Sequence, residues 1–521
     1  MPEDLEGPAQ PSAGLSRRRF LQLGGAGVVL VGGSLAGVRL LGGDTPASAS
    51  RVGPTSAAVT EAEAARPSTG QIVQRSLRAA PATVDLGGTT VKTWTFDGQM
   101  PGKEIRAKVG DELRVTLTND LPEGTSIHWH GLALRNDMDG VPGVTQSAIA
   151  PGSTFEYRFV LPHSGTYFFH PHVGVQLDRG LMAPLIIEDP NEAADYDEEV
   201  VLTLDDWTDG LGTGPDDLLA GFRQNGMALG GMAMGDMNMG DMNTGVGPAG
   251  PQKPLGDDTG DVAYPAHLIN GRLPNAPFTV DSAPGRRIRF RMINEGADTA
   301  YRFAIGGHRL TVTHSDGFPV RPVEVDTLLI GMGERYDVVV TAGDGAFPIV
   351  AVPEGKDDPA GFALLRTASG GAPAADIRPA QLGGQLLSYA DLSPTEEVTL
   401  PSRRPDRTLE VALTMGNGGR QWLINGQAFP DHDPLDIRSG ERVRLVFDNQ
   451  SMMFHPMHLH GHTFAVADQA GRGLRKDTIN VLPMQKLTVD FDADNPGQWL
   501  VHCHNIYHAE LGMMSVVSYL R

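Results

Sequence analysis

Hydrophobic and polar residues alternate along much of the chain in short runs, separated by turns rich in glycine and proline. The clearest runs, at residues 113–119, 288–294 and 443–449, place apolar side chains at every second position. A period of two is typical of a β-strand with one buried face. The pattern therefore predicts an all-β protein built from many short strands.

These runs belong to a unit that occurs three times. In each copy a turn like Ile-Asn-Gly-Arg at 269–272 is followed by a glycine and then by the alternating run, which ends in asparagine. A unit repeated at domain-sized intervals indicates duplication, and short strands joined by such turns indicate Greek-key sandwiches. We expect three β-sandwich domains, at residues 76–190, 196–368 and 385–521, with a linker at 369–384.

The N-terminus predicts export. Residues 16–21, Ser-Arg-Arg-Arg-Phe-Leu, resemble a twin-arginine signal, and an apolar run at 21–41 and Ala-Ser-Ala at 47–49 follow it. We therefore expect a signal peptide at 1–49, recognised by the twin-arginine export machinery, and a periplasmic, cell-envelope or extracellular protein. The alternative is an uncleaved membrane anchor, which an arginine and several glycines within the run disfavour. Residues 50–75 are predicted to form a disordered leader.

Composition narrows the choice of partner. The net charge of -21 argues against a nucleic-acid partner, because phosphate binding needs clustered Lys and Arg. The single cysteine excludes an internal disulfide framework. A lone cysteine near the C-terminus therefore needs another explanation.

Four His-x-His pairs indicate metal sites. On a strand, alternate residues share a face, so each pair directs two imidazoles toward the same site. One such pair is weak evidence, but four pairs in a duplicated chain leave little room for coincidence. The pairs are His128 with His130, His170 with His172, His458 with His460, and His502 with His504.

The cysteine lies inside the last pair, so the sulfur of Cys503 must face the side of the strand opposite to the two imidazoles. His508, Met513 and His455 lie near it in sequence. Two histidines, a thiolate and a weak axial methionine form the ligand set of a blue copper site. An electron that arrives at Cys503 is only a few covalent bonds from His502 or His504.

The motifs HWHG at 128–131, HPH at 170–172, HPMHLH at 455–460 and HCHNIYHAELGM at 502–513 resemble the copper motifs of three-domain multicopper oxidases. The resemblance is greatest to bacterial laccase-like and copper-resistance oxidases of an actinobacterial type. It implies three cupredoxin-like domains, four copper ions, and a reaction that takes single electrons from a substrate and reduces dioxygen to water.

The resemblance also implies a ligand assignment. Type 1 copper would be bound by His455, Cys503, His508 and Met513, and type 2 by His128 and His458. The type 3 pair would take His130, His170 and His504 on one ion, and His172, His460 and His502 on the other.

The repeats agree with this assignment when they are aligned. The first domain keeps trinuclear ligands but lacks the electron-accepting site, and the second domain should bind no copper. Alignment places Pro171 opposite Cys503, Gln176 opposite His508 and Leu181 opposite Met513.

Dioxygen reduction consumes protons, so an acid near the trinuclear centre is expected. Asp139 matches the family's acid near type 2 copper, and its other interpretation is a turn residue. Many bacterial relatives have a glutamate after the last histidine of the HCH segment. Here Ala509 takes that position and Glu510 follows, which leaves a second proton route in doubt.

Methionines suggest the electron donor. An insertion at 208–262 carries six in a segment rich in glycine, and thioethers favour Cu(I). Met415 and Met453 also match positions where cuprous oxidases place methionine ligands, although acidic partners are absent and Ser451 occupies one such position. The six are Met227, Met232, Met234, Met237, Met239 and Met242.

The leading hypothesis is a cuprous oxidase with side activity on phenols. The first alternative is a laccase whose donor is a phenol or aromatic amine. The second is a non-catalytic copper-sequestering protein, which should lack ligands, and none is missing here.

Overall fold

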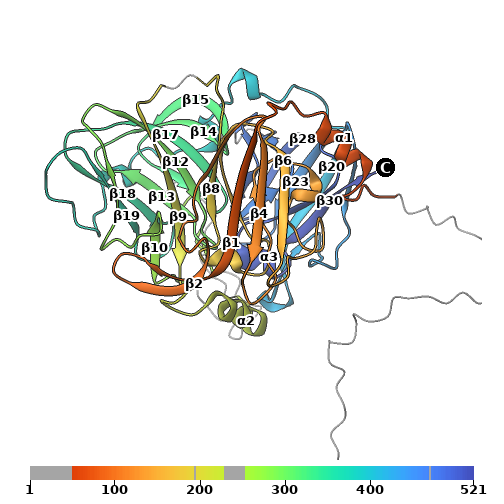
Figure 1. Cartoon of the computed structure of the whole chain (residues 1–521), viewed down its shortest axis with the longest axis horizontal. Coiled ribbons are helices and arrows are strands. Elements are labelled where there is room, and N and C mark those ends of the chain that lie inside the picture. The colour runs from red at the N-terminus through yellow and green to blue at the C-terminus, as the bar shows by residue number, and fades with distance from the viewer. Residues whose placement is uncertain (1–49, 193–194, 228–252, 469–470) are drawn as a thin grey trace, which may run out of the picture. The chain divides into compact units, whose positions relative to one another are not determined.

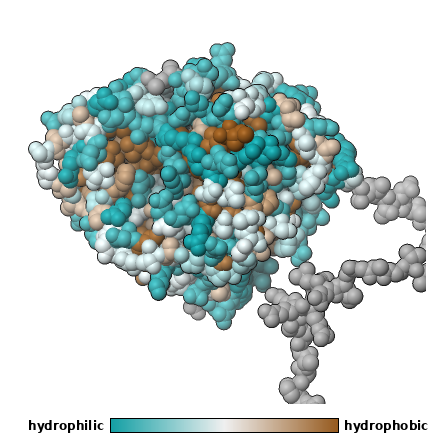
Figure 2. Space-filling view, in the orientation of Figure 1, coloured by the Kyte–Doolittle hydropathy of each residue, from teal (hydrophilic) through white to brown (hydrophobic). Residues whose placement is uncertain are grey.

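A computed structural model describes residues 50–192, 195–227, 253–468 and 471–521 of the chain. The expected export signal and the methionines from Met232 to Met242 lie outside these residues. Within them, no helix has the length and apolar character needed to cross a membrane. The face seen in Figure 2 is mostly hydrophilic, with separate hydrophobic patches.

The first domain consists of two sheets of four strands, ordered β2-β1-β4-β6 and β3-β8-β7-β5. In β4, buried positions alternate with partly exposed ones, as the sequence pattern predicts. The strands are β1 (Ile72–Asp85), β2 (Thr90–Phe96), β3 (Ile105–Lys108), β4 (Glu112–Asn119), β5 (His128–His130), β6 (Thr154–Val160), β7 (Gly165–His170) and β8 (Ala183–Glu188).

The second domain has a sheet of six strands, β10-β9-β12-β17-β14-β15, and one of five, β11-β19-β18-β13-β16. Its strands, yellow to green in Figure 1, lie beside those of the first domain. They are β9 (Glu198–Trp207), β10 (Ala266–Ile269), β11 (Phe278–Asp281), β12 (Arg287–Asn294), β13 (Tyr301–Ile305), β14 (Leu310–Ser315), β15 (Phe318–Val325), β16 (Leu328–Ile330), β17 (Arg335–Thr341), β18 (Ala346–Pro353) and β19 (Gly361–Arg366).

The third domain repeats this plan, with sheets β21-β20-β23-β28-β25-β26 and β22-β30-β29-β24-β27. Its short helix α3 (Ile506–Glu510) follows β29. The strands are β20 (Arg407–Gly416), β21 (Gln421–Ile424), β22 (Leu435–Arg438), β23 (Arg442–Asn449), β24 (His455–Leu459), β25 (Phe464–Val466), β26 (Arg475–Lys476), β27 (Thr478–Val481), β28 (Lys486–Asp492), β29 (Gln498–Cys503) and β30 (Met514–Leu520).

The three domains share one topology. The first strand of each pairs in parallel with the strand that follows the repeated glycine, as β1 with β4, β9 with β12 and β20 with β23. The repeated turns place Asp97, Asn270 and Asn425 in the left-handed region, at φ of 54°, 49° and 53°, each followed by glycine. This is the residue pair that tight hairpin turns prefer. The prediction of three cupredoxin-like sandwiches is confirmed, also by the structural likenesses reported below.

The prediction of a disordered leader at 50–75 is wrong. Residues Ala57–Ala64 form helix α1, and β1 begins at Ile72. The Val52 amide donates to the carbonyl of Tyr519, and the side chains of Val52 and Val59 are buried. The segment has few apolar residues, but these two dock on the folded domains, which composition alone does not reveal.

Two further segments differ from simple loops. The insertion after β9 begins with helix α2 (Pro215–Asn225), whose acidic first turn and proline suit a helix N-terminus. After the predicted linker at 369–384, Leu386 pairs with Thr327 of the second domain in a β-bridge. The chain between the second and third domains is therefore held against the second domain.

Candidate metal centres

Two pairs of neighbouring strands carry most of the predicted ligands. In the first domain β5 pairs with β7, and His128 lies opposite His170. In the third domain β24 pairs with β29, where His458 lies opposite His502 and Met457 opposite Cys503. Directly opposed residues share a face of a sheet, so each ladder holds its imidazoles on one side.

The ladders of the first and third domains bring their histidines together. The Nε2 atoms of His128 and His458 lie 3.4 Å apart. One ring nitrogen from each of His172, His460 and His502 lies within 4.8 Å of the others, and the Nε2 atoms of His460 and His502 are 3.1 Å apart. The predicted type 2 pair and one predicted type 3 set are thus assembled between two domains.

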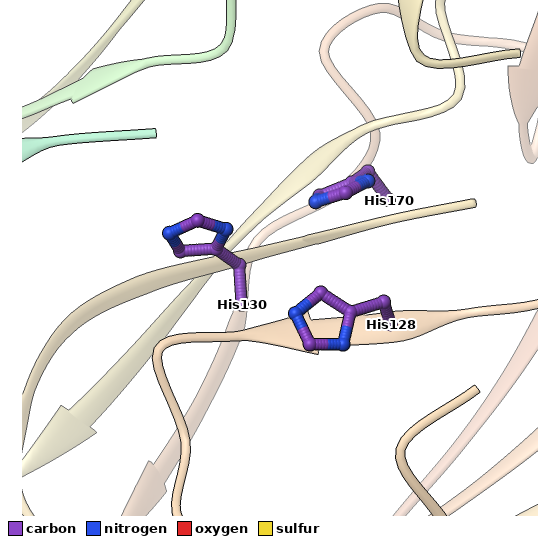
Figure 3. Close-up of side chains that lie close together, drawn as sticks. All are labelled: His128, His130 and His170. Atoms are coloured by element: carbon purple, nitrogen blue, oxygen red, sulfur yellow. The ribbon is translucent and has the colours of Figure 1, made fainter. Parts of the chain in front are cut away.

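The other predicted type 3 set lies beside them. Figure 3 shows His128, His130 and His170 around a common space, and one nitrogen from each lies within 4.8 Å of the others. The ring of His504 lies 4.8 Å from that of His130 and 5.4 Å from that of His170, centroid to centroid. The assignment of each histidine to one ion stays a prediction.

The histidines of this set fit a cation. His130 Nδ1, His170 Nε2 and both ring nitrogens of His504 are buried without a hydrogen-bond partner. A buried nitrogen without a partner is costly, and a metal ion would satisfy it. Burial, the largest cause, also lowers the pKa of each of these three imidazoles well below its ordinary value. They are therefore neutral, as metal ligands must be.

The predicted type 1 ligands also meet. Cys503 Sγ lies 3.6 Å from the Nδ1 atoms of both His455 and His508, and those two nitrogens are 3.1 Å apart. Met513 is buried, and its backbone carbonyl accepts from the Cys503 amide at 3.1 Å. Burial raises the pKa of the Cys503 thiol, so the thiolate needs a bound cation to form.

Comparison with known proteins decides the family. Sequence profiles described as multicopper oxidase match residues 79–192, 198–370 and 402–520. The chain is 45% identical to Multicopper oxidase MmcO of Mycobacterium tuberculosis, over 100% of both chains. It is 31% identical to a copper resistance protein A homolog of Pseudomonas syringae pv. tomato, over 83% of this chain and 90% of that one.

The chain belongs to the multicopper oxidases. The crystal structure of the laccase from Botrytis aclada is similar, with 28% identity, a TM-score of 0.69, and coverage of 89% of this chain and 90% of that one. This multicopper oxidase is an oxidoreductase that binds four copper ions, one of type 1, one of type 2 and a type 3 pair. When bound, copper supplies the one-electron chemistry that amino-acid side chains lack.

Two buried carboxylates hold the trinuclear histidines of this multicopper oxidase. Asp139 Oδ2 lies 3.0 Å from His460 Nδ1, and its Oδ1 lies 3.2 Å from His128 Nδ1. Such partners orient a ligand and make it a better donor. Asp139 is thus in contact with predicted ligands, which a turn residue alone would not require.

The second carboxylate, Asp477, was missed by the sequence analysis. Its Oδ1 lies 3.2 Å from His130 Nε2, and its backbone carbonyl lies 2.9 Å from His458 Nδ1. It lies between β26 and β27, in no motif that includes a histidine. Its position directly before β27, the strand that pairs with β24, is visible only in the sheet register.

The type 1 ligands have different outer partners. Ser451 Oγ lies 2.8 Å from His455 Nε2, and Asp261 Oδ2 accepts from His508 Nε2 at 2.9 Å. Ser451 does occupy the position where an acid was expected, and the second domain instead supplies an acid, Asp261, from the end of its insertion. Glu510 instead contacts Arg223 of α2, with 3.5 Å between its Oε2 and the Arg223 Nη2.

Proposed function

We propose that this multicopper oxidase is a cuprous oxidase in copper tolerance, which converts Cu(I) to Cu(II) and retains side activity on phenols. The observation that carries this proposal is a carboxylate and three thioether side chains gathered from separate segments beside the type 1 histidines. The copper resistance proteins among its relatives support a role in copper tolerance.

Two of the thioethers lie near Trp422, which packs on the type 1 ligand His508. Met227 Sδ lies 3.0 Å from Trp422 Nε1, and the Trp422 ring packs on His508 with centroids 4.3 Å apart. The Met227 amide donates to the carbonyl of Gly419 at 3.0 Å. Met415 Sδ also borders Gly419, at 3.6 Å from the position that a Cβ would occupy there. Two of the predicted substrate methionines therefore meet at one glycine.

The third thioether belongs to the segment that leads into the type 1 ligand His455. Met453 is buried two residues before His455, and it forms a β-bridge with Asp258 of the insertion. Soft thioethers select Cu(I), and a carboxylate attracts the cation electrostatically. An electron released beside Asp261 has a hydrogen-bonded path through His508 toward Cys503.

Four Cu(I) ions give four electrons, which with four protons reduce one dioxygen to two waters. On this chain the second domain would bind the donor, the strand His502–Cys503–His504 would carry electrons, and Asp139 would hold a proton near the trinuclear histidines. We also propose that the chain is exported by the twin-arginine route, because residues 16–21 and the apolar run at 21–41 resemble such a signal.

The proposal is tested by two variants, Asp261→Asn and Met227→Leu. Each keeps the shape of its side chain and removes a charge or a sulfur. Both should raise the KM for Cu(I) and change the oxidation of a simple phenol much less. Met182→Leu, a buried methionine of the first domain, is the matched control and should change neither rate.

The methionine segment gives a second test. Replacing its six methionines with leucine should lower the rate at limiting Cu(I) and leave phenol oxidation equal or faster, because the sulfur has no evident use for a phenol. Equal loss of both activities would make the segment structural. Unchanged Cu(I) kinetics with collapsed phenol oxidation would replace the cuprous oxidase with the laccase.

A further inference from the structure

A buried ionic network joins the second and third domains. Its members come from three places: Asp316 follows β14, Glu334 directly precedes β17 and Arg335 begins it, and Lys476 ends β26, with Asp477 next in the chain. All five side chains are 0% exposed. Burying five charged groups is costly unless their charges balance.

The charges in this network do not balance. The guanidinium of Arg335 pairs with Asp477, with 2.7 Å from Nη1 to Oδ1. Lys476 Nζ is left to face two carboxylates, at 3.1 Å from Asp316 Oδ2 and 2.9 Å from Glu334 Oε1. Three carboxylates therefore face two cations. One bound proton would restore neutrality in a region that water does not reach.

The outer end of the network reaches a cavity of about 480 Å³ between the two domains. Its walls include Leu387 and Leu482, and its polar lining includes Tyr389 and Asn480. Tyr389 Oη donates to Glu334 Oε1 at 2.7 Å, and Asn480 Nδ2 donates to Glu334 Oε2 at 2.8 Å. Tyr389 thus connects the cavity to the first carboxylate.

The inner end reaches the trinuclear histidines. Asp316 Oδ2 accepts from the backbone amides of Asp477 and Thr478, each at 3.2 Å. The same two residues contact His130 Nε2, with Thr478 Oγ1 at 3.1 Å. The charge on Asp316 therefore interacts electrostatically with the trinuclear histidines, because the groups between them are buried and water screens the interaction little.

We propose that Glu334, Lys476 and Asp316 form a proton-loading site that takes up one proton from water in the cavity when electrons reach the trinuclear centre. A hydrated proton (hydronium) from the cavity is transferred to Tyr389 Oη as Tyr389 passes its own proton to Glu334 Oε1, which leaves only water in the cavity. Lys476 takes that proton as it gives one to Asp316 Oδ2. One proton enters, no bond to carbon changes, and the charge of the arriving electron is compensated.

The environment of Asp316 supports a proton there. Burial, the largest cause, raises its pKa to about 6, although Lys476 and Arg335 lower it. The other ionisable groups that face it are Asp477, Glu334, Tyr336 and Tyr167. The site does not depend on which donor supplies the electrons, so it stands or falls separately from the cuprous oxidase proposal.

The decisive experiment counts protons. The copper-loaded enzyme is reduced without dioxygen in weakly buffered solution near neutral pH, and a pH indicator reports the protons taken up per molecule. Asp316→Asn should take up about one proton fewer than the parent. Asp337→Asn is the matched control, because Arg289 and Arg291 hold the equally buried Asp337. Its proton count should not change.

A milder variant tests the path. Tyr389→Phe removes the hydroxyl through which Tyr389 connects Glu334 to the cavity. Proton uptake should become several-fold slower. The final number of protons and the blue band should stay the same. A parental count in Asp316→Asn, or unchanged uptake kinetics in Tyr389→Phe, would overturn the proposal.

Copper-free protein gives an independent readout. An acid with a raised pKa in the folded state binds its proton first on folding, so acidification from about pH 6 toward 3.8 should stabilise the fold at this position. Asp316→Asn should lose that contribution, so acidification over this range should lower the free energy of unfolding more in the variant than in the parent. An identical pH profile for parent and variant would contradict a titrating Asp316. If Asp316→Asn does not fold, Glu334→Gln makes the same predictions.

Discussion

The first and third domains hold the same pair of strands, but only one of them carries an electron-accepting site. In the third domain His455 and His508 approach Cys503. In the first domain the corresponding positions hold Thr125 and Gln176, and Thr125 Oγ1 donates to Gln176 Oε1 at 2.7 Å. A neutral hydrogen-bonded pair has replaced two metal ligands.

The comparison of the first and third domains shows that the same backbone can hold either metal ligands or hydrogen-bonded side chains. Buried polar groups need partners, and in the third domain a cation would supply them. In the first domain the Gln176 Nε2 amide also donates to the Glu123 carboxylate, 2.7 Å away, and to the Gly124 carbonyl, 2.9 Å away. Pro171 and Leu181 complete the change, since neither offers a ligand atom. The same cupredoxin-like fold thus accommodates either a set of metal ligands or a hydrogen-bonded pair at these positions.

The largest expected effect comes from making the third domain more like the first. Cys503→Ser should abolish the blue absorption band and nearly all turnover, because the thiolate is both ligand and electron path. The fold should persist, since apolar strands around the site build the core. Absorption spectroscopy and dioxygen consumption measure both losses. A variant that oxidised substrate at the parental rate would refute the electron path.

Asp139→Asn should affect the trinuclear side alone. It should slow reoxidation of the reduced enzyme by dioxygen about a hundredfold or more, the usual cost of losing an acid or base. The type 1 spectrum should stay intact, because the type 1 ligands are elsewhere. Stopped-flow mixing with dioxygen measures the rate. An unchanged rate would leave Asp139 as a purely structural residue.

Gln176→Ala tests the replaced site in the first domain. Removing a buried side chain with three hydrogen bonds should lower the free energy of unfolding by about 1 to 3 kcal/mol. The blue band and the type 1 potential should not change. Denaturant unfolding of copper-free protein gives the energy. A changed type 1 potential would show that the two domains are coupled in a way the comparison does not include.

The smallest effect is expected for Met513→Leu, which installs the residue type that the first domain has at Leu181. The swap conserves volume and should cost less than about 1.5 kcal/mol. The type 1 reduction potential should rise, because a weak donor that stabilises Cu(II) is lost, while the blue colour remains. Potentiometry checks this. An unchanged or lower potential would mean that Met513 is not the axial ligand.

The fold, and which histidines the structure brings together, could be predicted from the sequence because both depend on local patterns. Alternation, a repeated turn and His-x-His spacing each occupy a few consecutive residues. On a strand, such spacing already determines which side chains share a face. The two ladders then needed only the antiparallel register to bring His458 opposite His502.

The partners of those ligands could not be predicted in this way. Asp261 and Asp477 reach histidines that are distant in sequence, His508 and His130, across domain boundaries. Nothing in the local sequence separates them from other aspartates in turns. The docked segment at 50–75 was missed for the same reason, because its order depends on contacts with the end of the chain.

The placement of Cys503 between two histidines has a mechanical consequence. The inner path of the electron consists of covalent bonds within one strand, so bending between domains cannot lengthen it. Surrounding loops, in contrast, are free to diverge. Surface loops can therefore be exchanged, by evolution or by design, without changing the covalent electron-transfer path from Cys503 to His502 and His504.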